Sequence, residues 1–379
     1  MLERRRLPRG AIRAAVLTAW ERPLELREYP AIERIGPGEA LVRVEMAGIC
    51  GTDVHLWRGQ LPIPLPVILG HESVGAIEQL GAGLDHDWRK NPLSPGDRVT
   101  WASSIVCGEC FYCRLKRQPT RCLKRRAYGI SYCADEPPHL GGGYAEKILL
   151  RAGTAIFRIP AGLATESVIG AGCALVTAIH GLERVPVGWG DVVVIQGAGP
   201  VGLAALAVSR QCGAARVIAI GGPPHRLELA RKFGASAVID IAQAPDPAER
   251  IRLAVQETGG YGADVVIECV GHPAAVREGV EMCRDGGRYL VLGQYGNAGE
   301  VLFNPHVITR KQLQITGSWG FEPRHLDRAL SLLAGSGWGE LFAQEVSDRF
   351  PLDQADAALE TVREWRSAKA VLTPNGDRG

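Results

Sequence analysis

Short runs of branched apolar residues, separated by glycine and proline turns, occupy about the first 150 residues of the chain. Examples are RAAVLTAW, EALVRVEMAG and HESVGAIEQLG. Each run is short, and in several of them apolar residues alternate with polar ones. The pattern predicts an irregular, mostly antiparallel β domain in this part of the chain.

The pattern changes near Thr165. The segment DVVVIQGAGPVGLAALAVSRQCGAARVIAIGG indicates a buried strand, a glycine-rich turn, an apolar helix and a second strand. Further apolar strands, SAVIDI, ADVVIECVG and GRYLVLGQYG, are separated by helical segments. Strands that alternate with helices predict a doubly wound parallel sheet, and therefore an α/β fold class. After about Thr316 two amphipathic helices precede a last expected strand, KAVLTP.

The chain length indicates the number of domains, and the net charge indicates which partners to expect. A chain of 379 residues favours two domains, and a net charge of +2 gives no sign of nucleic-acid or membrane binding. The basic start, MLERRRLPRG, lacks the apolar run of a secretory signal, and no stretch of about 18 apolar residues follows. We expect a solvated N-terminal arm, a cytoplasmic location and no membrane or nucleic-acid partner. In that compartment clustered cysteines are more often metal ligands than disulfides.

The glycine turn GAGPVG follows a β-branched strand and opens an apolar helix, as dinucleotide binding requires. Gly197 permits the tight turn, Gly199 lets the backbone approach a pyrophosphate, and Gly202 allows close packing of helix and strand. The free N–H groups at the helix N-terminus then face the phosphates. A purely structural turn is the alternative interpretation.

The end of the second strand bears on the choice of cofactor. An acidic residue there would hold the ribose 2′-hydroxyl of NAD, but the chain has Gly221 followed by Gly222. His225 and Arg226 lie just beyond and could pair with a 2′-phosphate. Arg226 could equally hold an unphosphorylated ribose or begin a solvated helix. We therefore expect NAD(P), with a slight preference for NADP.

Three distant segments together offer metal ligands. GICGTDVHLW contributes Cys50, ILGHESVG contributes His71 and Glu72, and IGAGCALVTAIHGL contributes Cys173. A single buried cysteine or histidine more often packs than binds a metal. Two thiolates, an imidazole and a nearby carboxylate, however, suit a catalytic zinc ion with one open position.

With these motifs in this order, the chain resembles the zinc-dependent alcohol dehydrogenases of the medium-chain dehydrogenase/reductase superfamily, from Ala14 to the C-terminus. The resemblance implies a GroES-like, β-rich catalytic domain (1–174 and 317–379) and a Rossmann domain (175–316). It also implies catalytic zinc ligands at Cys50, His71 and Cys173, with Glu72 able to enter the metal shell. Further implied roles are orientation of the histidine by Asp53, a proton relay through Thr52 and His55, and cofactor contacts at Pro200, Val201, Thr177 and Val270.

Cys107, Cys110, Cys113 and Cys122 follow the spacing C-x2-C-x2-C-x8-C. Four thiolates so close in sequence can close a tetrahedral zinc site, and a site filled by protein is structural. The family's structural zinc lobe resembles this segment, usually with one residue fewer before the last cysteine. A disulfide pair and a nucleic-acid-binding finger are the alternatives.

The chain also departs from the family. Gly51 stands where many members have a basic residue that reaches the pyrophosphate, and residues 84–96 form a longer link than usual. Polyol and threonine dehydrogenases often have an acidic residue in place of Cys173, so the cysteine disfavours a polyol site.

The expected activity is reversible hydride transfer between an alcohol and NAD(P), with one catalytic and one structural zinc ion per chain. Five residues at pocket or near-pocket positions of the family favour a secondary or medium-sized, even cyclic, alcohol over a free sugar: Leu56, Trp57, Ser103, Trp319 and Phe321. A packing role is an equal alternative for Trp57 and Phe321. Open alternatives are a polyol or amino-alcohol dehydrogenase, a zinc-free double-bond reductase and a non-catalytic binding protein. A homodimer or homotetramer is expected.

Overall fold

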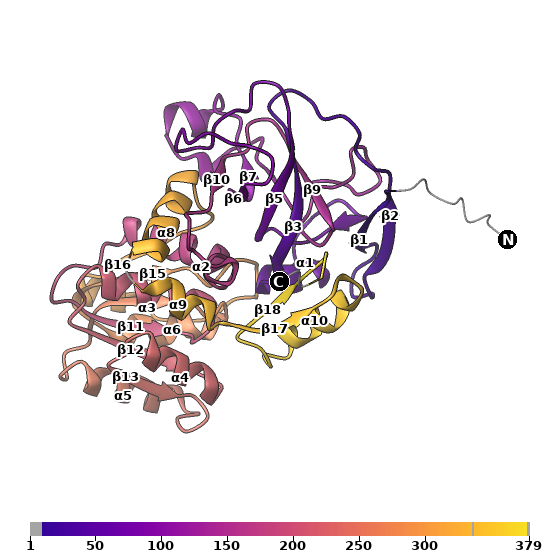
Figure 1. Cartoon of the computed structure of the whole chain (residues 1–379). Coiled ribbons are helices and arrows are strands. Elements are labelled where there is room, and N and C mark those ends of the chain that lie inside the picture. The colour runs from indigo at the N-terminus through magenta and orange to yellow at the C-terminus, as the bar shows by residue number, and fades with distance from the viewer. Residues whose placement is uncertain (1–9, 336, 377–379) are drawn as a thin grey trace. The chain divides into compact units, whose positions relative to one another are not determined.

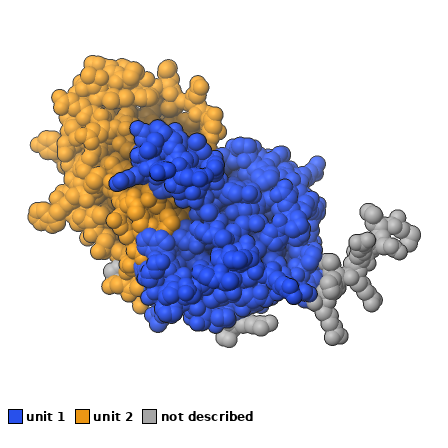
Figure 2. Space-filling model, turned by 90° about the horizontal axis from the view of Figure 1, so that it is seen from above, with its two compact units in different colours: residues 1–172, 342–379 blue, residues 173–341 orange. Residues whose placement is uncertain are grey.

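The computed structural model describes residues 10–335 and 337–376, so most of the expected basic arm lies outside the described residues (Figure 1). The chain forms two compact units, which Figure 2 shows in different colours. The first contains Met1–Gly172 and Phe342–Gly379, and the second contains Cys173–Leu341.

The first unit is rich in β structure, as predicted. Its larger sheet has the order β10-β6-β5-β3-β18-β17, with β9 also paired to β3. The strands are β3 (Ala40–Gly48), β5 (Ser73–Leu80), β6 (Arg98–Trp101), β9 (Lys147–Leu150), β10 (Ile156–Arg158), β17 (Val346–Phe350) and β18 (Lys369–Leu372). Pairing is antiparallel except between β17 and β18.

Smaller elements complete this unit. A three-stranded sheet has the order β2-β1-β4, and a further pair joins β7 to β8. Their bounds are β1 (Ile12–Leu17), β2 (Glu25–Tyr29), β4 (Val67–Ile68), β7 (Ser104–Ile105) and β8 (Arg126–Ala127). The helical elements are α1 (Gly51–Trp57), α10 (Ala355–Arg363) and the short turns η1 (Phe111–Leu115), η2 (Pro119–Arg121) and η3 (Leu352–Gln354).

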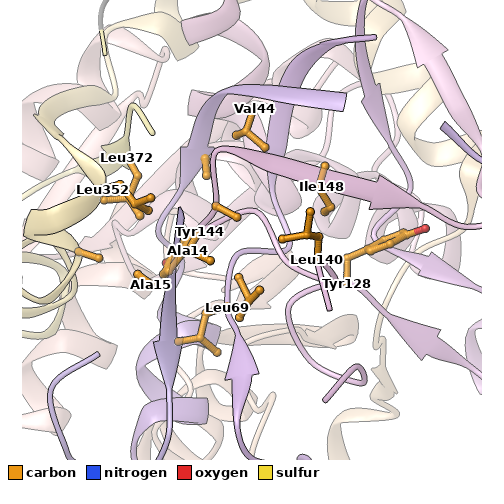
Figure 3. Packing of buried hydrophobic residues seen from close by; sticks show 14 of the residues in the cluster. Ala14, Ala15, Val44, Leu69, Tyr128, Leu140, Tyr144, Ile148, Leu352 and Leu372 are labelled. Atoms are coloured by element: carbon orange, nitrogen blue, oxygen red, sulfur yellow. The ribbon is translucent and has the colours of Figure 1, made fainter. Parts of the chain in front are cut away.

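The two ends of the chain share one hydrophobic core. Leu352 and Leu372, from the C-terminal segment, lie in the same buried cluster as Ala14 and Tyr144 (Figure 3). Strand β18 also pairs with β3, so that Leu372 lies opposite Ala47. The C-terminal segment therefore completes the first unit, because it fills a core that the N-terminal strands leave open.

The long link at residues 84–96 covers the edge of the larger sheet. The Trp88 N–H donates to the Ile156 carbonyl of β10 at 2.7 Å, and the Asp87 carboxylate accepts from the Arg158 N–H at 3.2 Å. Since β10 ends the sheet, these bonds occupy backbone groups that an edge strand otherwise exposes. The link thus has a structural explanation.

The second unit is a six-stranded parallel sheet in the order β13-β12-β11-β14-β15-β16. Its strands are β11 (Val192–Gln196), β12 (Arg216–Gly221), β13 (Ala237–Asp240), β14 (Ala263–Glu268), β15 (Cys283–Val291) and β16 (Gln314–Gly317). Helices connect them: α3 (Pro200–Gln211), α4 (Pro224–Lys232), α5 (Pro247–Glu257), α6 (Pro273–Met282) and α7 (His306–Lys311). Each of α3 to α6 begins with proline, whose missing N–H costs nothing in a first turn. The predicted doubly wound fold is confirmed.

The compact units divide at Gly172 and Leu341, whereas we expected domain boundaries at residues 174 and 316. Helix α8 (Pro323–Gly335) explains why the segment after β16 packs within the second unit. His325 of α8 is fully buried, stacks on His180 with ring centroids 4.7 Å apart, and its Nε2 lies 3.0 Å from Glu183. Helix α9 (Trp338–Ala343) then leads the chain back to the first unit.

Helix α2 (Thr165–Arg184) is the one helix among the described residues that is long and apolar enough to span a membrane. In the fold, 72% of its most apolar window is buried inside the protein. This burial is typical of a core helix.

Candidate metal centres and nucleotide-binding turn

Ligand atoms of Cys50, His71, Glu72 and Cys173 all lie within 4.8 Å of one another. Cys50 immediately precedes α1, His71 and Glu72 immediately precede β5, and Cys173 lies within α2. Segments that are far apart in the sequence therefore supply a single cluster of two thiols, an imidazole and a carboxylate.

Helix capping fixes the position of Cys50. Its thiol accepts the Thr52 N–H at 3.5 Å, and its own N–H donates to the Asp53 carboxylate at 2.8 Å. This reciprocal arrangement satisfies backbone donors at the start of a helix. Because both partners lie in the first turn of α1, the cysteine is held at the helix N-terminus.

Two glycines make room for the carboxylate of Glu72. A Cβ atom on Gly48 would lie 2.6 Å from Glu72 Oε2, and one on Gly172 would lie 2.8 Å from both carboxylate oxygens. Gly172 also has φ 42° and ψ −145°, which kinks α2 immediately before Cys173. A side chain at Gly172 would therefore disturb both the carboxylate and the turn that orients the cysteine.

The Asp53 carboxylate lies 3.4 Å from His71 Nδ1, and both side chains are buried. Burial lowers the pKa of His71, but the charges and hydrogen bonds of Asp53 and Cys50 outweigh it, so the pKa lies well above its ordinary value. With Nδ1 facing Asp53, Nε2 is the ring nitrogen left for a metal ion.

Lys369, the first residue of β18, forms a buried ion pair with Glu72, and both side chains are only 3% exposed. The sequence-based prediction missed this lysine. Its signal was weak: a single cation before a short apolar strand near the C-terminus, almost 300 positions from its partner.

The donor set fits zinc. Ligands about 2.0–2.3 Å from a tetrahedral ion lie less than about 4 Å from one another, which is compatible with the observed cluster. Cys50, His71 and Cys173 would fill three positions and leave one open, the composition of catalytic zinc sites.

The expected relay residues lie on α1. His55 Nδ1 is 2.5 Å from the Gln60 side-chain oxygen, an acceptor, so Nδ1 is engaged and Nε2 is the ring nitrogen that remains for other partners. Thr52 and His55 are partly exposed, whereas Leu56 is fully buried in the core. Gly51 has open space around its Cβ position, in keeping with the absent basic residue.

The four lobe cysteines also meet. Thiols of Cys107, Cys110, Cys113 and Cys122 lie within 4.8 Å of one another, and all are free. The sulfur atoms of Cys107 and Cys122 are 3.5 Å apart, too far for the bond of about 2.05 Å in a disulfide. The extra residue before Cys122 does not keep it from the cluster.

Backbone N–H groups prepare part of the lobe for metal binding. Those of Cys113 and Leu123 lower the pKa of Cys110 to about 6, which favours its thiolate at neutral pH. Burial, with the neighbouring thiols, raises the pKa of Cys113 to about 12. A metal ion would supply the positive charge that lets the remaining thiols ionise.

The glycine turn has the geometry that dinucleotide binding needs. Gly197 has φ 104°, and a Cβ atom on Gly202 would lie 1.8 Å from the Gly197 carbonyl oxygen. Gly199 precedes α3, which begins with Pro200 and Val201. Gly197 and Gly202 therefore tolerate no side chain, and the N-terminus of α3 opens toward the turn.

Arg226 is buried rather than solvated. One of its terminal guanidinium nitrogens lies 3.7 Å from the Cβ position of Gly199, so its charge lies beside the turn. Gly221 ends β12, and a Cβ atom there would lie 2.7 Å from Ala198.

The remaining predicted residues are distributed over both units. Thr177 is partly buried on α2, and Val270 is 44% exposed just after β14. Trp57 donates to the Arg22 carbonyl at 2.8 Å, a contact that favours a packing role. Trp319 stacks on Tyr295 with ring centroids 5.6 Å apart.

Comparison with known proteins decides the family. A family model described as an alcohol dehydrogenase GroES-like domain matches residues 36–161, and one described as a zinc-binding dehydrogenase matches residues 200–335. The 5-exo-hydroxycamphor dehydrogenase of Pseudomonas putida is 38% identical over 364 residues, which cover 95% of this chain and 98% of that protein. The chain belongs to the zinc-dependent alcohol dehydrogenase family.

Solved structures of the family agree with this fold. An alcohol dehydrogenase from Thermotoga maritima matches with a TM-score of 0.91 at 34% identity, covering 96% of this chain and all of that one. A zinc-binding dehydrogenase from Sinorhizobium meliloti, bound to NADP, matches with a TM-score of 0.82 at 28% identity, covering 96% and 100%. As a member of the alcohol dehydrogenase family, the protein is an oxidoreductase that transfers a hydride between an alcohol and NAD(P).

Proposed function

We propose that Cys50, His71 and Cys173 hold a catalytic zinc ion, with Glu72 beside it, and that the substrate is a secondary or medium-sized alcohol, including cyclic alcohols. The ligand cluster of two thiols, an imidazole and a carboxylate carries the proposal. Similarity to a dehydrogenase of hydroxycamphor supports the cyclic substrate class. A zinc-free double-bond reductase is disfavoured, because it has no need of either cysteine cluster.

A bound zinc ion would supply Lewis acidity that lowers the pKa of a substrate hydroxyl. The chain's own residues would then transfer the proton that the substrate hydroxyl releases. Thr52 would accept it from the substrate hydroxyl as its own hydroxyl proton leaves toward His55, and His55 would pass a proton to solvent; a ribose hydroxyl of bound cofactor would supply the link between the two side chains. With Nδ1 engaged by Gln60, Nε2 is the nitrogen of His55 that is left for this transfer.

We also propose a structural zinc ion at Cys107, Cys110, Cys113 and Cys122, since no position would remain for substrate. Paired cysteine variants test both sites. Cys50→Ser should abolish turnover while nucleotide binding persists. Cys110→Ser should lose one zinc ion per chain and lower the thermal unfolding temperature, because a structural zinc contributes folding free energy.

The measurements are zinc content, nucleotide affinity, turnover and thermal unfolding, with Cys212→Ser as control because Cys212 is exposed and outside both clusters. Persistent turnover in Cys50→Ser would reject the catalytic site. Parental zinc content and stability in Cys110→Ser would reject the structural one.

The cofactor proposal is a preference for NADP, based on buried Arg226 beside the turn and the absence of a carboxylate at Gly221. Arg226→Leu should lower kcat/KM for NADP by about tenfold or more, the usual effect of losing a charge-assisted bond, and change kcat/KM for NAD little. Assays with both cofactors over alcohols of graded size measure this. An equal loss with both cofactors would assign Arg226 to the pyrophosphate or to packing instead.

Location and assembly complete the proposal. We infer a cytoplasmic homodimer or homotetramer that acts on small molecules, without nucleic-acid or membrane partners. The nearly neutral net charge supports the lack of a nucleic-acid partner.

A further inference from the structure

Glu268, the last residue of β14, is fully buried at the carboxyl edge of the parallel sheet. Its Oε1 accepts the N–H groups of Val270 at 2.7 Å and Gly271 at 2.6 Å, and its Oε2 accepts the Gly293 N–H at 3.0 Å. Its main-chain carbonyl also accepts from Leu292 at 2.9 Å and Gly293 at 3.0 Å. One residue thus forms hydrogen bonds with two loops, residues 269–272 after β14 and residues 292–296 after β15.

The two loops touch backbone to backbone. A Cβ atom on Gly271 would lie 2.6 Å from the Gly293 carbonyl oxygen, and one on Gly293 would lie 2.4 Å from the Gly271 nitrogen. Gly271 and Gly293 therefore tolerate no side chain, because the two backbones are too close at this point. Their separation depends on the hydrogen bonds that converge on Glu268.

The sheet order places these loops relative to the nucleotide. From β11 the chain builds outward through β12 and β13, and from β14 it builds the other way through β15 and β16. Dinucleotides bind at such a reversal, across the carboxyl ends of the strands. A Cβ atom on Gly197 would lie 2.9 Å from the Cys269 carbonyl oxygen, so the loop after Glu268 borders the glycine turn.

The two halves of the sheet then differ in what they hold. The half from β11 to β13 carries the glycine turn and Arg226, which belong with the pyrophosphate and the adenosine. The half from β14 to β16 remains for the nicotinamide nucleoside. Both loops fastened by Glu268 lie at the carboxyl ends of strands in this second half.

We propose that Glu268 is a positioning residue, which holds the loops 269–272 and 292–296 in the arrangement that receives the nicotinamide half of the cofactor. It acts through the backbone and need not touch the cofactor itself. The inference rests on the proposed nucleotide site.

Glu268→Gln tests it. The amide keeps one acceptor oxygen but turns an NH2 group toward N–H donors, so one loop loses its bonds to this side chain while the main-chain bonds remain. Bonds to a buried charged acceptor are the stronger kind. The dissociation constants of NADH, NADPH and ADP-ribose are measured by titration calorimetry on the full chain. We expect affinity for NADH and NADPH to fall about tenfold, and that for ADP-ribose, which lacks nicotinamide, to change less than about twofold.

Asp264→Asn is the matched control. Asp264 lies on the same strand near the opposite edge, where it accepts the Val192 N–H at 2.8 Å and pairs with Arg284 at 2.6 Å. Asp264→Asn should lower the free energy of unfolding without changing the ratio of the affinity for NADH to that for ADP-ribose. A purely structural role for Glu268 would give the same result as this control.

An unchanged ratio in Glu268→Gln would overturn the inference. If the parent chain bound neither NADH, NADPH nor ADP-ribose, the proposed nucleotide site itself would be wrong. Should Glu268→Gln not fold, Glu268→Asp keeps the charge but shortens the reach by one methylene. An intermediate change in the ratio would then support the inference, and the parental ratio would reject it.

Discussion

At the scale of single residues, the candidate catalytic site depends on charges that compensate one another in a buried space. Asp53 faces His71, and Lys369 pairs with Glu72 beside the thiols. Glycines at positions 48 and 172 give the Glu72 carboxylate the space that a side chain would fill. The clustered thiols, imidazole and carboxylate could be predicted from motifs, whereas the roles of Lys369 and Glu268 could not, because these depend on partners that no local pattern specifies.

Lys369→Met should destabilise the protein by about 3–5 kcal/mol, since it leaves the Glu72 carboxylate buried without its cation. The double variant Lys369→Met/Glu72→Gln removes both charges and should recover part of this loss. Urea unfolding of the zinc-free proteins measures both effects, because a zinc ion beside Glu72 would offset the lost cation. Strictly additive losses would show that the pair does not stabilise the fold through its charges.

At the scale of elements, a helix and a link have structural roles that their sequence patterns did not reveal. Helix α2 was predictable as apolar, but its kink at Gly172, which turns Cys173 toward the cluster, was not. The link at residues 84–96 had no role in the sequence-based prediction. Only the pairing order showed that it lies against β10, the edge strand of its sheet.

The edge-covering link should contribute to stability through Asp87, which is 3% exposed and accepts from the Asn91 N–H at 2.8 Å as well as from Arg158. Asp87→Ala should cost about 1–3 kcal/mol, because partly buried N–H donors lose their buried acceptor. Asp85→Ala is the control, since Asp85 is highly exposed and its pair with His86 lies on the surface. It should change stability by less than about 0.5 kcal/mol. Equal effects in urea unfolding would contradict this role for the link.

At the scale of the whole molecule, the chain leaves the first unit at Gly172, builds the second and returns at Phe342. The return fills the first core with Leu352 and Leu372. Within the second unit, α8 closes against α2 through the stacked His180 and His325. Composition and periodicity indicated two domains, but not that the segment 317–341 would pack with the second.

The stability of the whole chain should depend on pH through His325. Burial, followed by the charges of Arg324 and His180, lowers the pKa of His325 to about 4, and its Nδ1 already accepts the Glu322 N–H. The unfolded chain binds this proton near pH 6.5 and the folded chain only near pH 4. Stability should therefore fall by up to about 3 kcal/mol as the pH drops through this window.

Urea unfolding from pH 7 to pH 4 measures this loss, and His325→Gln, which cannot titrate, should show a smaller one. Parallel stability curves for the parent and His325→Gln would exclude His325 as the cause.

Local patterns were enough to predict the β-rich and doubly wound units, the glycine turn, and the thiols and imidazole suited to zinc. Strand periodicity, turn glycines and ligand types are properties of neighbouring residues, so they can be detected without a fold. Three features emerge only when the chain is folded: the pairing of Glu72 with Lys369, the convergence of two loops on Glu268 and the covering of β10. Each of these is a long-range contact, and the identity of its partner is set by how the chain packs.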